Sequence, residues 1–371
     1  MNNFQSQLRL AVVTTVAALS AWTAVSVLAS TQPTSPADNV RIGSSNTMEI
    51  APQAHVLGSA RSVVTGAADA AAGVWVLSRD RADQALWLSQ VAASGILSDR
   101  ALPLGSAGIQ AGLAPTGTAV WAGAGSRIVR VDRLTGATKT FELTRPSGAV
   151  ISASRAPDGT VLGLGNVTSL ALDADGQNLW IARYAANAIT VLRTSDGSSH
   201  EVPIGSDYDA DRLVLAHDHL WFTVNSGPGG RLAAAIGHLN TQSLDVRFLP
   251  MFARSLTIRP DGIHALGDTW ARIDPLTQRI IPVLSPAASL DSSTETVDAA
   301  GNLVARGAGQ TKLFVVSPQG ASRTISYDQG SFINSAGTRV ATNSPLAFAT
   351  TDTAQTLWFA PRGGPTVFAV R

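Results

Sequence analysis

The chain has 371 residues, a formal charge of +1 and no cysteine. The missing thiols exclude a disulfide framework, a zinc–thiolate site and a cysteine nucleophile. The near balance of 27 basic and 26 acidic residues argues against nucleic-acid binding, which normally requires a basic excess. A hydrophobic fraction of 45% argues against a disordered chain.

The first segment in chain order has the features of a secretory signal. Arg9 adds a positive charge to the amino-terminal region, residues 10–29 carry no charge, and Val27-Leu28-Ala29 offers small residues for a signal peptidase. We expect residues 1–29 to be a signal peptide and residues 30–45 to be a flexible lead-in. The predicted location is therefore the bacterial periplasm or the exterior. The alternative is an uncleaved membrane anchor, because 20 residues without charge can just span a bilayer.

A repeat occupies the remainder of the chain, residues 46–371. Each unit has a short alternating strand, a tight turn that often contains Asp-Gly, and a Leu-Trp or Val-Trp pair that opens a second strand. Seven copies recur with a mean spacing of about 47 residues, close to the length of a four-stranded propeller blade. Two copies lack the tryptophan. The seven positions are Trp75, Trp121, Trp180, Trp221, His264, Val304 and Trp358.

The second half of each unit reads as a hairpin with Asp, Gly or Asn in its turn. Clear examples span residues 127–143, 188–204, 236–250 and 271–284. No helical periodicity is present, so the sequence predicts an all-β fold, a seven-bladed β-propeller with four-stranded antiparallel blades. Residues 150–165 and 331–344 are extra hairpin-like pieces, and eight blades is the alternative if one of them forms a partial blade.

The ends of the repeat suggest how the ring closes. Residues 365–371 match a third strand, so the last unit lacks its outermost strand. Residues 47–53 match an isolated fourth strand in polarity. We therefore predict closure by strand exchange between the termini, which removes an open sheet edge. The result is one domain, residues 46–371, expected to be monomeric.

Three local motifs resemble a known family. Leu220-Trp221-Phe222-Thr223, Leu357-Trp358-Phe359 and the segment from Asp173 to Trp180 resemble the repeats of streptogramin B lyase-like propellers. The hairpin at residues 134–143 is similar to those of NHL- and YVTN-type propellers. The resemblance covers nearly the whole chain after the signal at the level of the repeat period. The resemblance implies the fold and gives little information about activity, since propellers have unrelated functions.

The resemblance to the lyases would imply a magnesium-assisted elimination that opens a cyclic depsipeptide ester, with a His base and a Glu and a second His near the metal. The family usually has Glu three residues after the repeat Trp. The corresponding residues here are Ser78, Ala124, Arg183, Val224, Gly267, Gly307 and Pro361. The chain has only four Glu, which are Glu49, Glu142, Glu201 and Glu295. No catalytic residue is therefore carried over, and the prediction leans against an enzyme.

Alignment of the units predicts an anion-binding site. Arginines lie just beyond the Trp strand in four units, and three other polar residues share that corner. The seven candidate ligand-binding residues are Arg79, Arg183, Tyr184, Asn225, Asp268, Arg306 and Arg362. Four guanidiniums at one end of the central channel would attract a small anion. The alternative is that each Arg pairs with an Asp of the next blade.

Two further clusters could bind a metal ion. Alternating carboxylates at Asp207, Asp209 and Asp211 could chelate Ca²⁺ or Mg²⁺. However, Arg212 stands where a calcium loop has Gly, so an acidic surface loop paired with Arg212 is the favoured interpretation. His217-Asp218-His219 falls in a turn, and adjacent side chains of a strand point to opposite faces. No cofactor is otherwise predicted.

The sequence therefore predicts an exported propeller that serves as a binding or interaction scaffold. Its ligand, a small anion, or its protein partner would contact the Arg-bearing end of the channel. The alternative is a lyase or hydrolase with a site in the same channel. A His beside a carboxylate on that face favours the enzyme, whereas an Arg-rich mouth without such a pair favours binding.

Overall fold

The computed structural model describes most of the repeat region. It covers residues 52–370 except 59, 70, 72, 105–110, 147–153, 156–160, 163–164, 206–207, 227–234, 260, 268–269, 285–289, 298–300, 308–311, 318–320, 327–331, 334–338 and 341–345. The signal peptide and lead-in predicted from the sequence lie outside the described residues. The described residues contain no helix with the length and apolarity needed to cross a bilayer.

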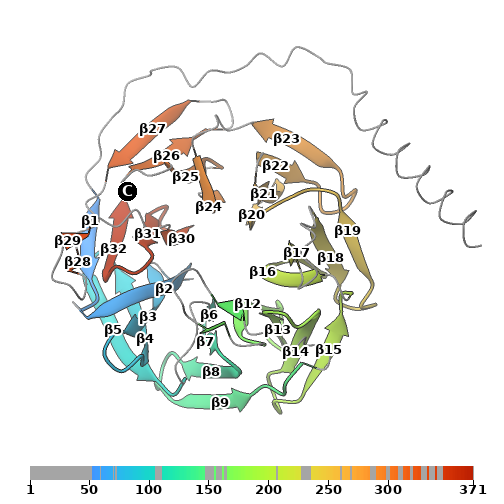
Figure 1. Cartoon of the computed structure of the whole chain (residues 1–371), viewed down its shortest axis with the longest axis horizontal. Coiled ribbons are helices and arrows are strands. Elements are labelled where there is room, and N and C mark those ends of the chain that lie inside the picture. Colours follow the sequence, from blue (N-terminus) through green and yellow to red (C-terminus); the bar gives the residue numbers. More distant parts are fainter. Residues whose placement is uncertain are drawn as a thin grey trace, which may run out of the picture. The chain divides into compact units, whose positions relative to one another are not determined.

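Seven four-stranded antiparallel sheets form a ring of blades, as the sequence predicts (Figure 1). We number the blades 1 to 7 from the sheet β2–β5 onward. The innermost strands are β2 (Arg61–Ala68), β6 (Ala111–Pro115), β12 (Val167–Leu172), β16 (Tyr208–Ala216), β20 (Ser255–Arg259), β24 (Leu290–Val297) and β30 (Leu346–Thr351). The second strands are β3 (Val74–Asp80), β7 (Ala119–Ala124), β13 (Asn178–Arg183), β17 (His219–Ser226), β21 (Gly262–Leu266), β25 (Leu303–Gly307) and β31 (Leu357–Pro361).

The outer half of each blade is the predicted hairpin. The third strands are β4 (Leu86–Ala92), β8 (Arg127–Asp132), β14 (Ala188–Arg193), β18 (Ile236–Asn240), β22 (Trp270–Ile273), β26 (Lys312–Val316) and β32 (Thr366–Val370). The outermost strands are β5 (Gly95–Leu102), β9 (Thr138–Glu142), β15 (Ser199–Pro203), β19 (Val246–Leu249), β23 (Ile280–Leu284), β27 (Ser322–Ser326) and, in blade 7, β1 (Gln53–Val56).

Blade 7 combines both ends of the described chain, so the predicted strand exchange is confirmed. β1 runs antiparallel to β32, with Gln53 opposite Ala369 and Val56 opposite Thr366. The backbone N–H of Leu57 then donates to the carbonyl of Pro365 at 3.0 Å. The third strand of blade 7 therefore has a partner on both sides, and blade 7 has four strands like the other blades.

The predicted position of this closing strand needs correction. The sequence placed it at residues 47–53, but the described strand spans Gln53–Val56, and residues 47–51 lie outside the described part. His55 is the one buried residue of β1, and its ring centroid lies 5.7 Å from that of Trp358. A histidine therefore occupies the inward position of this strand, which hid the alternation of its buried and exposed residues.

The two extra segments form small hairpins outside the four-stranded blades. One pairs β10 (Ser154–Arg155) with β11 (Val161–Leu162), and the other pairs β28 (Phe332–Ile333) with β29 (Arg339–Val340). Each lies in one of the long gaps between repeat units. The count of seven blades is therefore confirmed, and the eight-bladed alternative is wrong.

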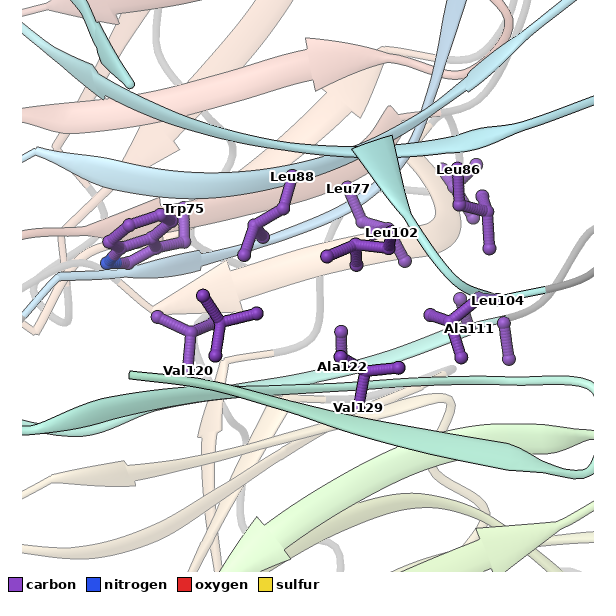
Figure 2. Close-up of a cluster of buried hydrophobic side chains, with 13 residues drawn as sticks. Trp75, Leu77, Leu86, Leu88, Leu102, Leu104, Ala111, Val120, Ala122 and Val129 are labelled. Atoms are coloured by element: carbon purple, nitrogen blue, oxygen red, sulfur yellow. The ribbon is translucent and has the colours of Figure 1, made fainter. Parts of the chain in front are cut away.

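The repeat tryptophans form part of the hydrophobic core between neighbouring blades. Figure 2 shows the cluster in which Trp75, Leu77 and Leu88 of blade 1 face Val120 and Val129 of blade 2. All five side chains are buried. A Trp at the second strand thus fills the space that widens between blades away from the ring centre, which explains its recurrence.

Blade 5 shows how a unit without the repeat Trp is filled. His264 occupies the Trp position, is 3% exposed, and accepts a hydrogen bond at 2.9 Å on Nδ1 from Nε1 of Trp270 in the next strand. His264 therefore packs in the core at the position that Trp occupies in other units. The indole has moved from the second strand to the third, so the aromatic volume of the unit is retained.

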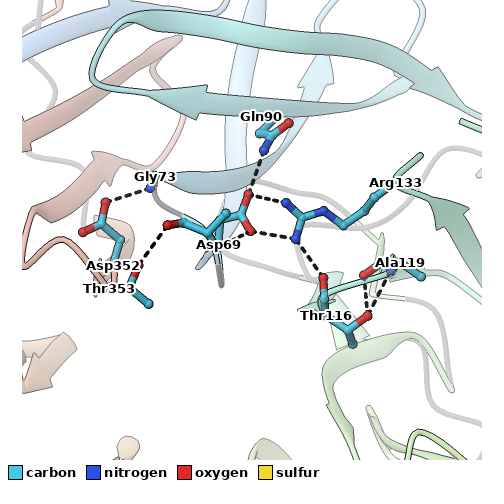
Figure 3. Close-up of polar contacts among 9 residues, drawn as sticks. Asp69, Gly73, Gln90, Thr116, Ala119, Arg133, Asp352 and Thr353 are labelled. Carbon is cyan, nitrogen blue, oxygen red and sulfur yellow. Dashed lines mark hydrogen bonds and ion pairs between the residues drawn. The ribbon is translucent and has the colours of Figure 1, made fainter. Parts of the chain in front are cut away.

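A buried polar network links blades 7, 1 and 2 on the side of the turns between first and second strands (Figure 3). The carboxylate of Asp69 accepts hydrogen bonds from both terminal nitrogens of Arg133, at 2.8 and 2.9 Å, and from Nε2 of Gln90 at 2.7 Å. On the other side, Oδ2 of Asp352 accepts the backbone N–H of Gly73 at 2.7 Å. These side chains tie the seam blade to its neighbours.

Candidate functional site

The innermost strands surround a central cavity of about 270 Å³. Its lining comes from β2, β6, β12, β16 and β30 and from β20 with the residue that precedes it. The side chains of β24 at residues 290–296 lie outside the description. Most of the surface that is exposed inside this cavity belongs to polar atoms. The cavity is therefore suited to a ligand that forms hydrogen bonds rather than to a purely apolar one.

Blade 4 contributes an arginine through an irregularity in its innermost strand. The pairing of β16 with β17 shifts between Ala210 and Leu213, which is a β-bulge. The backbone N–H of Leu213 donates to the hydroxyl of Ser169 in blade 3 at 3.1 Å. A side chain of the neighbouring blade thus adds a hydrogen bond to the strand pairing of the bulge.

Arg212 lies inside this bulge and lines the cavity. Its backbone N–H donates to the hydroxyl of Thr223 at 3.0 Å, and the hydroxyl of Thr168 donates to the carbonyl of Asp211 at 3.0 Å. Thr168 and Thr223 are both buried. Because hydroxyls on both sides hold the bulge, the guanidinium of Arg212 starts from a fixed backbone position.

Arg254 contributes a second guanidinium from blade 5. It immediately precedes β20, and its backbone N–H donates to the carbonyl of Leu266 at 2.7 Å. Its guanidinium carbon lies 5.3 Å from the centre of the Phe252 ring, within the range of a cation–π contact. Within the described part of the chain, neither Arg212 nor Arg254 forms an ion pair with a carboxylate.

The described lining of the cavity contains no His, Asp or Glu. The two guanidiniums are therefore the only charged groups that the described residues bring to its lining. From the sequence, Arg212 was expected only as a partner for the acidic loop, and Arg254 was not among the predicted site residues. The available signal was an arginine in the middle of an innermost strand, where other described units have small or apolar residues.

The strand register brings the predicted arginines to one end of the ring. Arg79 lies opposite Ser62, Arg183 opposite Val167 and Arg306 opposite Asp291, each near the start of an innermost strand. Arg362 directly follows β31, at the corresponding place in blade 7. None of these four is among the residues that line the cavity.

Arg183 and Arg306 are almost completely buried, with exposed fractions of 2% and 1%. Arg183 donates from Nε to the carbonyl of Gly165 at 2.8 Å and from Nη1 to that of Thr144 at 2.7 Å. Burial lowers the pKa of the Arg183 guanidinium, and the Glu201 carboxylate opposes this effect. Arg183 therefore holds the chain around the start of blade 3, whereas Arg79 and Arg362 are half-buried.

The other predicted ligand-binding residues are only partly described. Tyr184 is half-buried, and its backbone N–H donates to the carbonyl of Asn166 at 2.8 Å. Asn225 belongs to β17 and lies opposite Asp209, but its side chain is outside the description. Asp268 is not among the described residues. Whether any of them contacts a ligand stays a prediction.

The predicted metal-binding carboxylates have separate surroundings. Asp207 is outside the described residues, Asp211 is half-buried, and Asp209 is 4% exposed. Oδ1 of Asp209 accepts the backbone N–H of Asn187 at 3.3 Å, while burial raises the pKa of Asp209. Across the described ranges, no group of three or more His, Asp or Glu side chains is placed to hold a metal ion.

The histidine cluster lies at the turn between β16 and β17, as predicted. His217 has a φ of 55°, a left-handed turn conformation. The ring of His219 lies 4.5 Å from that of His238 in β18, and the indole of Trp221 lies 4.4 Å from His238 on another side. Burial and the neighbouring His219 lower the pKa of His238 to about 4.

No family model matches this chain, and no curated protein matches it. Solved structures match its fold. A streptogramin B lyase has 14% identity and a TM-score of 0.62, with 86% of this chain and 97% of that chain covered. A catalytically inactive virginiamycin B lyase from Staphylococcus aureus with quinupristin has 18% identity and a TM-score of 0.59, with coverages of 86% and 99%.

A propeller of another kind matches nearly as well. The Pan2 WD40 domain of Neurospora crassa has 9% identity and a TM-score of 0.56, with 85% of this chain and 96% of that chain covered. At these identities the likeness shows the fold alone. The resemblance to streptogramin B lyase propellers that the repeat motifs indicated is therefore confirmed at the level of the fold.

Proposed function

We propose that this chain is an exported β-propeller that binds a small anion in its central cavity. The observation that carries the proposal is the pair Arg212 and Arg254, which line the cavity and have no carboxylate partner within the described ranges. Two guanidiniums in a recess supply charge-assisted hydrogen bonds to an oxyanion. The uncharged segment at residues 10–29 supports export to the periplasm or the exterior.

Arg254 precedes the start of an innermost strand, so the proposed site opens toward the end of the ring that carries Arg79 and Arg183. Those side chains would add to the positive potential at the mouth. The ligand would therefore enter at this positively charged end of the ring and then meet the two guanidiniums of the cavity. The proposed site lies within one copy of the chain, so the monomer that we expect would bind the ligand.

A lyase activity is the second candidate, because the fold matches streptogramin B lyase. Elimination needs a base beside the reacting carbon, and the described lining offers no imidazole or carboxylate. Incubation with quinupristin and Mg²⁺, followed by mass spectrometry, tests this candidate. Opening of the cyclic ester would favour the lyase, and an unchanged compound favours the binding protein.

Thermal unfolding with glucuronate, acetate, sulfate and phosphate tests the binding proposal. A ligand at ten times its Kd stabilises the fold by about 1.4 kcal/mol. We expect one or more of these anions to stabilise the wild type, and Arg212→Gln/Arg254→Gln to lose that effect. Arg127→Gln/Arg193→Gln is the control, because it removes the same charge from exposed residues outside the cavity lining. Equal stabilisation of all three proteins, or of none, would overturn the proposal.

A further inference from the structure

Residues with small side chains form part of the cavity wall. Each innermost strand is the terminal strand of its sheet, so one of its edges has no strand partner. In β2 the residues at this wall are Thr65, Gly66, Ala67 and Ala68, which have small side chains. Backbone N–H and C=O groups on such an edge stay accessible to a ligand and need hydrogen-bond partners.

Close contact between blades keeps these side chains small. A Cβ added to Gly66 would lie 2.6 Å from the ring of Phe348, and one added to Gly112 would lie 2.6 Å from the side chain of Leu170. Both distances are far below van der Waals contact. The exposure of the backbone at the cavity is therefore a consequence of how the blades pack, and larger apolar side chains cannot cover it there.

Hydroxyl groups add donors and acceptors around the ring. Thr65 and Thr350 lie on blades 1 and 7, while Ser255 and Thr257 lie on blade 5 beside Arg254. No hydrogen bond within the described part engages the hydroxyls of Ser255 and Thr257. A ligand that fills this cavity thus meets hydrogen-bonding groups on several sides.

Among the described residues of the lining, in contrast, the charged side chains lie on one side. Arg212 and Arg254 belong to blades 4 and 5, which are adjacent and lie across the seven-bladed ring from blade 1 (Figure 1). The wall formed by β2 has no charged side chain among its lining residues. One end of the ligand therefore needs the negative charge, and the remainder needs neutral hydrogen-bonding groups.

We propose that the ligand is a polyhydroxylated carboxylate, a sugar acid of five or six carbons; this deepens the proposed function and rests on it. A cavity of 150 Å³ holds benzene, so a cavity of 270 Å³ holds roughly eleven non-hydrogen atoms on the same scale. A five-carbon sugar acid has this size, and a six-carbon acid such as glucuronate would extend by two atoms toward the open end of the cavity. The carboxylate lies against Arg212 and Arg254. The hydroxyls exchange hydrogen bonds with Thr257, Thr65 and the free strand edges.

Isothermal titration with three matched compounds tests the ligand class. Glucuronate has both features, glucose lacks the carboxylate, and cyclohexanecarboxylate lacks the hydroxyls. We expect glucuronate to bind at least tenfold more tightly than either of the other two, since unpaired polar groups in the wall penalise an apolar ring. Thr257→Val should weaken glucuronate about three- to tenfold and leave cyclohexanecarboxylate unchanged. Thr138→Val, on the exposed face of β9, is the control.

The outcomes separate this inference from the function on which it rests. If cyclohexanecarboxylate or phosphate binds as tightly as glucuronate, and Arg212→Gln/Arg254→Gln abolishes that binding, the anion site stands and the sugar-acid class is wrong. If no anion binds, or binding does not depend on these arginines, both proposals are wrong. Weakened glucuronate binding in Thr257→Val but not in Thr138→Val supports the sugar acid.

Discussion

The buried Asp69–Arg133 pair offers the sharpest test of how blades 7, 1 and 2 are held together. The carboxylate of Asp69 is fully buried and accepts two hydrogen bonds from Arg133, one from Gln90 and one from the backbone N–H of Ala71 at 3.2 Å. The guanidinium of Arg133 also lies 5.6 Å from the ring of Trp75. Asp69→Asn keeps the shape of the side chain, removes its charge and places a donor where donors already converge.

The expected loss of stability follows from the burial of the two groups. Removal of one partner from a buried ion pair costs about 3 to 5 kcal/mol, because the other charge stays in the interior. Arg133 is 17% exposed, so water screens it in part, and we expect a value near the lower end, about 3 kcal/mol. With an unfolding entropy of about 2.1 cal/mol/K per residue, a ring of about 320 residues would lose roughly 4 °C in Tm.

Urea unfolding of a double-mutant cycle measures this coupling. The cycle contains the wild type, Asp69→Asn, Arg133→Met and the double variant, and we expect a coupling energy of about 2 kcal/mol. Glu142→Gln is a matched control in the exposed pair with Arg127, and it should cost at most about 1 kcal/mol. Additive effects in the cycle, or equal losses in Asp69→Asn and Glu142→Gln, would refute the reasoning.

Two further predictions concern Arg183 and His238. Arg183→Met should lose about 2 kcal/mol of stability, since it removes two charged hydrogen bonds to backbone carbonyls. Its ligand affinity should stay within about twofold, and full stability with lost affinity would instead make Arg183 a ligand-binding residue. The pKa of His238 is about 4 in the folded state and 6.5 in the unfolded chain, so its neutral form is favoured by folding. Its contribution is complete above pH 6.5, and up to about 3 kcal/mol is lost as the pH falls toward 4. His238→Gln should flatten that part of the urea-unfolding profile, and a profile equal to that of the wild type would contradict the assignment.

The ring and its closure were predictable because they depend on volume and alternation, which recur in every unit. A Trp at the second strand fills the space between blades, so its spacing of about 47 residues gives the length of one blade. His264 can replace the Trp of the repeat because a partly polar ring packs in the core when its nitrogen accepts a hydrogen bond, here from Trp270. The closing strand was misplaced because His55, not an aliphatic residue, faces inward.

The cavity arginines were harder to predict because a repeat alignment assumes equal spacing within each unit. The bulge between Ala210 and Leu213 changes the register of β16, and it turns Arg212 toward the centre of the ring. The alignment instead selected Arg183, whose position is regular and which donates to the carbonyls of Thr144 and Gly165 ahead of blade 3. Hydroxyls on other strands hold the bulge, and pairings so distant in sequence carry no local signal.

This contrast identifies where function can reside in such a fold. Solved propellers that include a lyase and a WD40 domain share the architecture at less than 20% identity, so the regular part of the ring cannot specify a ligand. A feature repeated in every blade serves what every blade needs, which is packing against its neighbours. Among the described residues of the cavity lining, Arg212 and Arg254 break the repeat, and they lie on two adjacent blades. A one-sided charge in a nearly symmetric cavity gives a ligand a single orientation, and recognition requires that asymmetry.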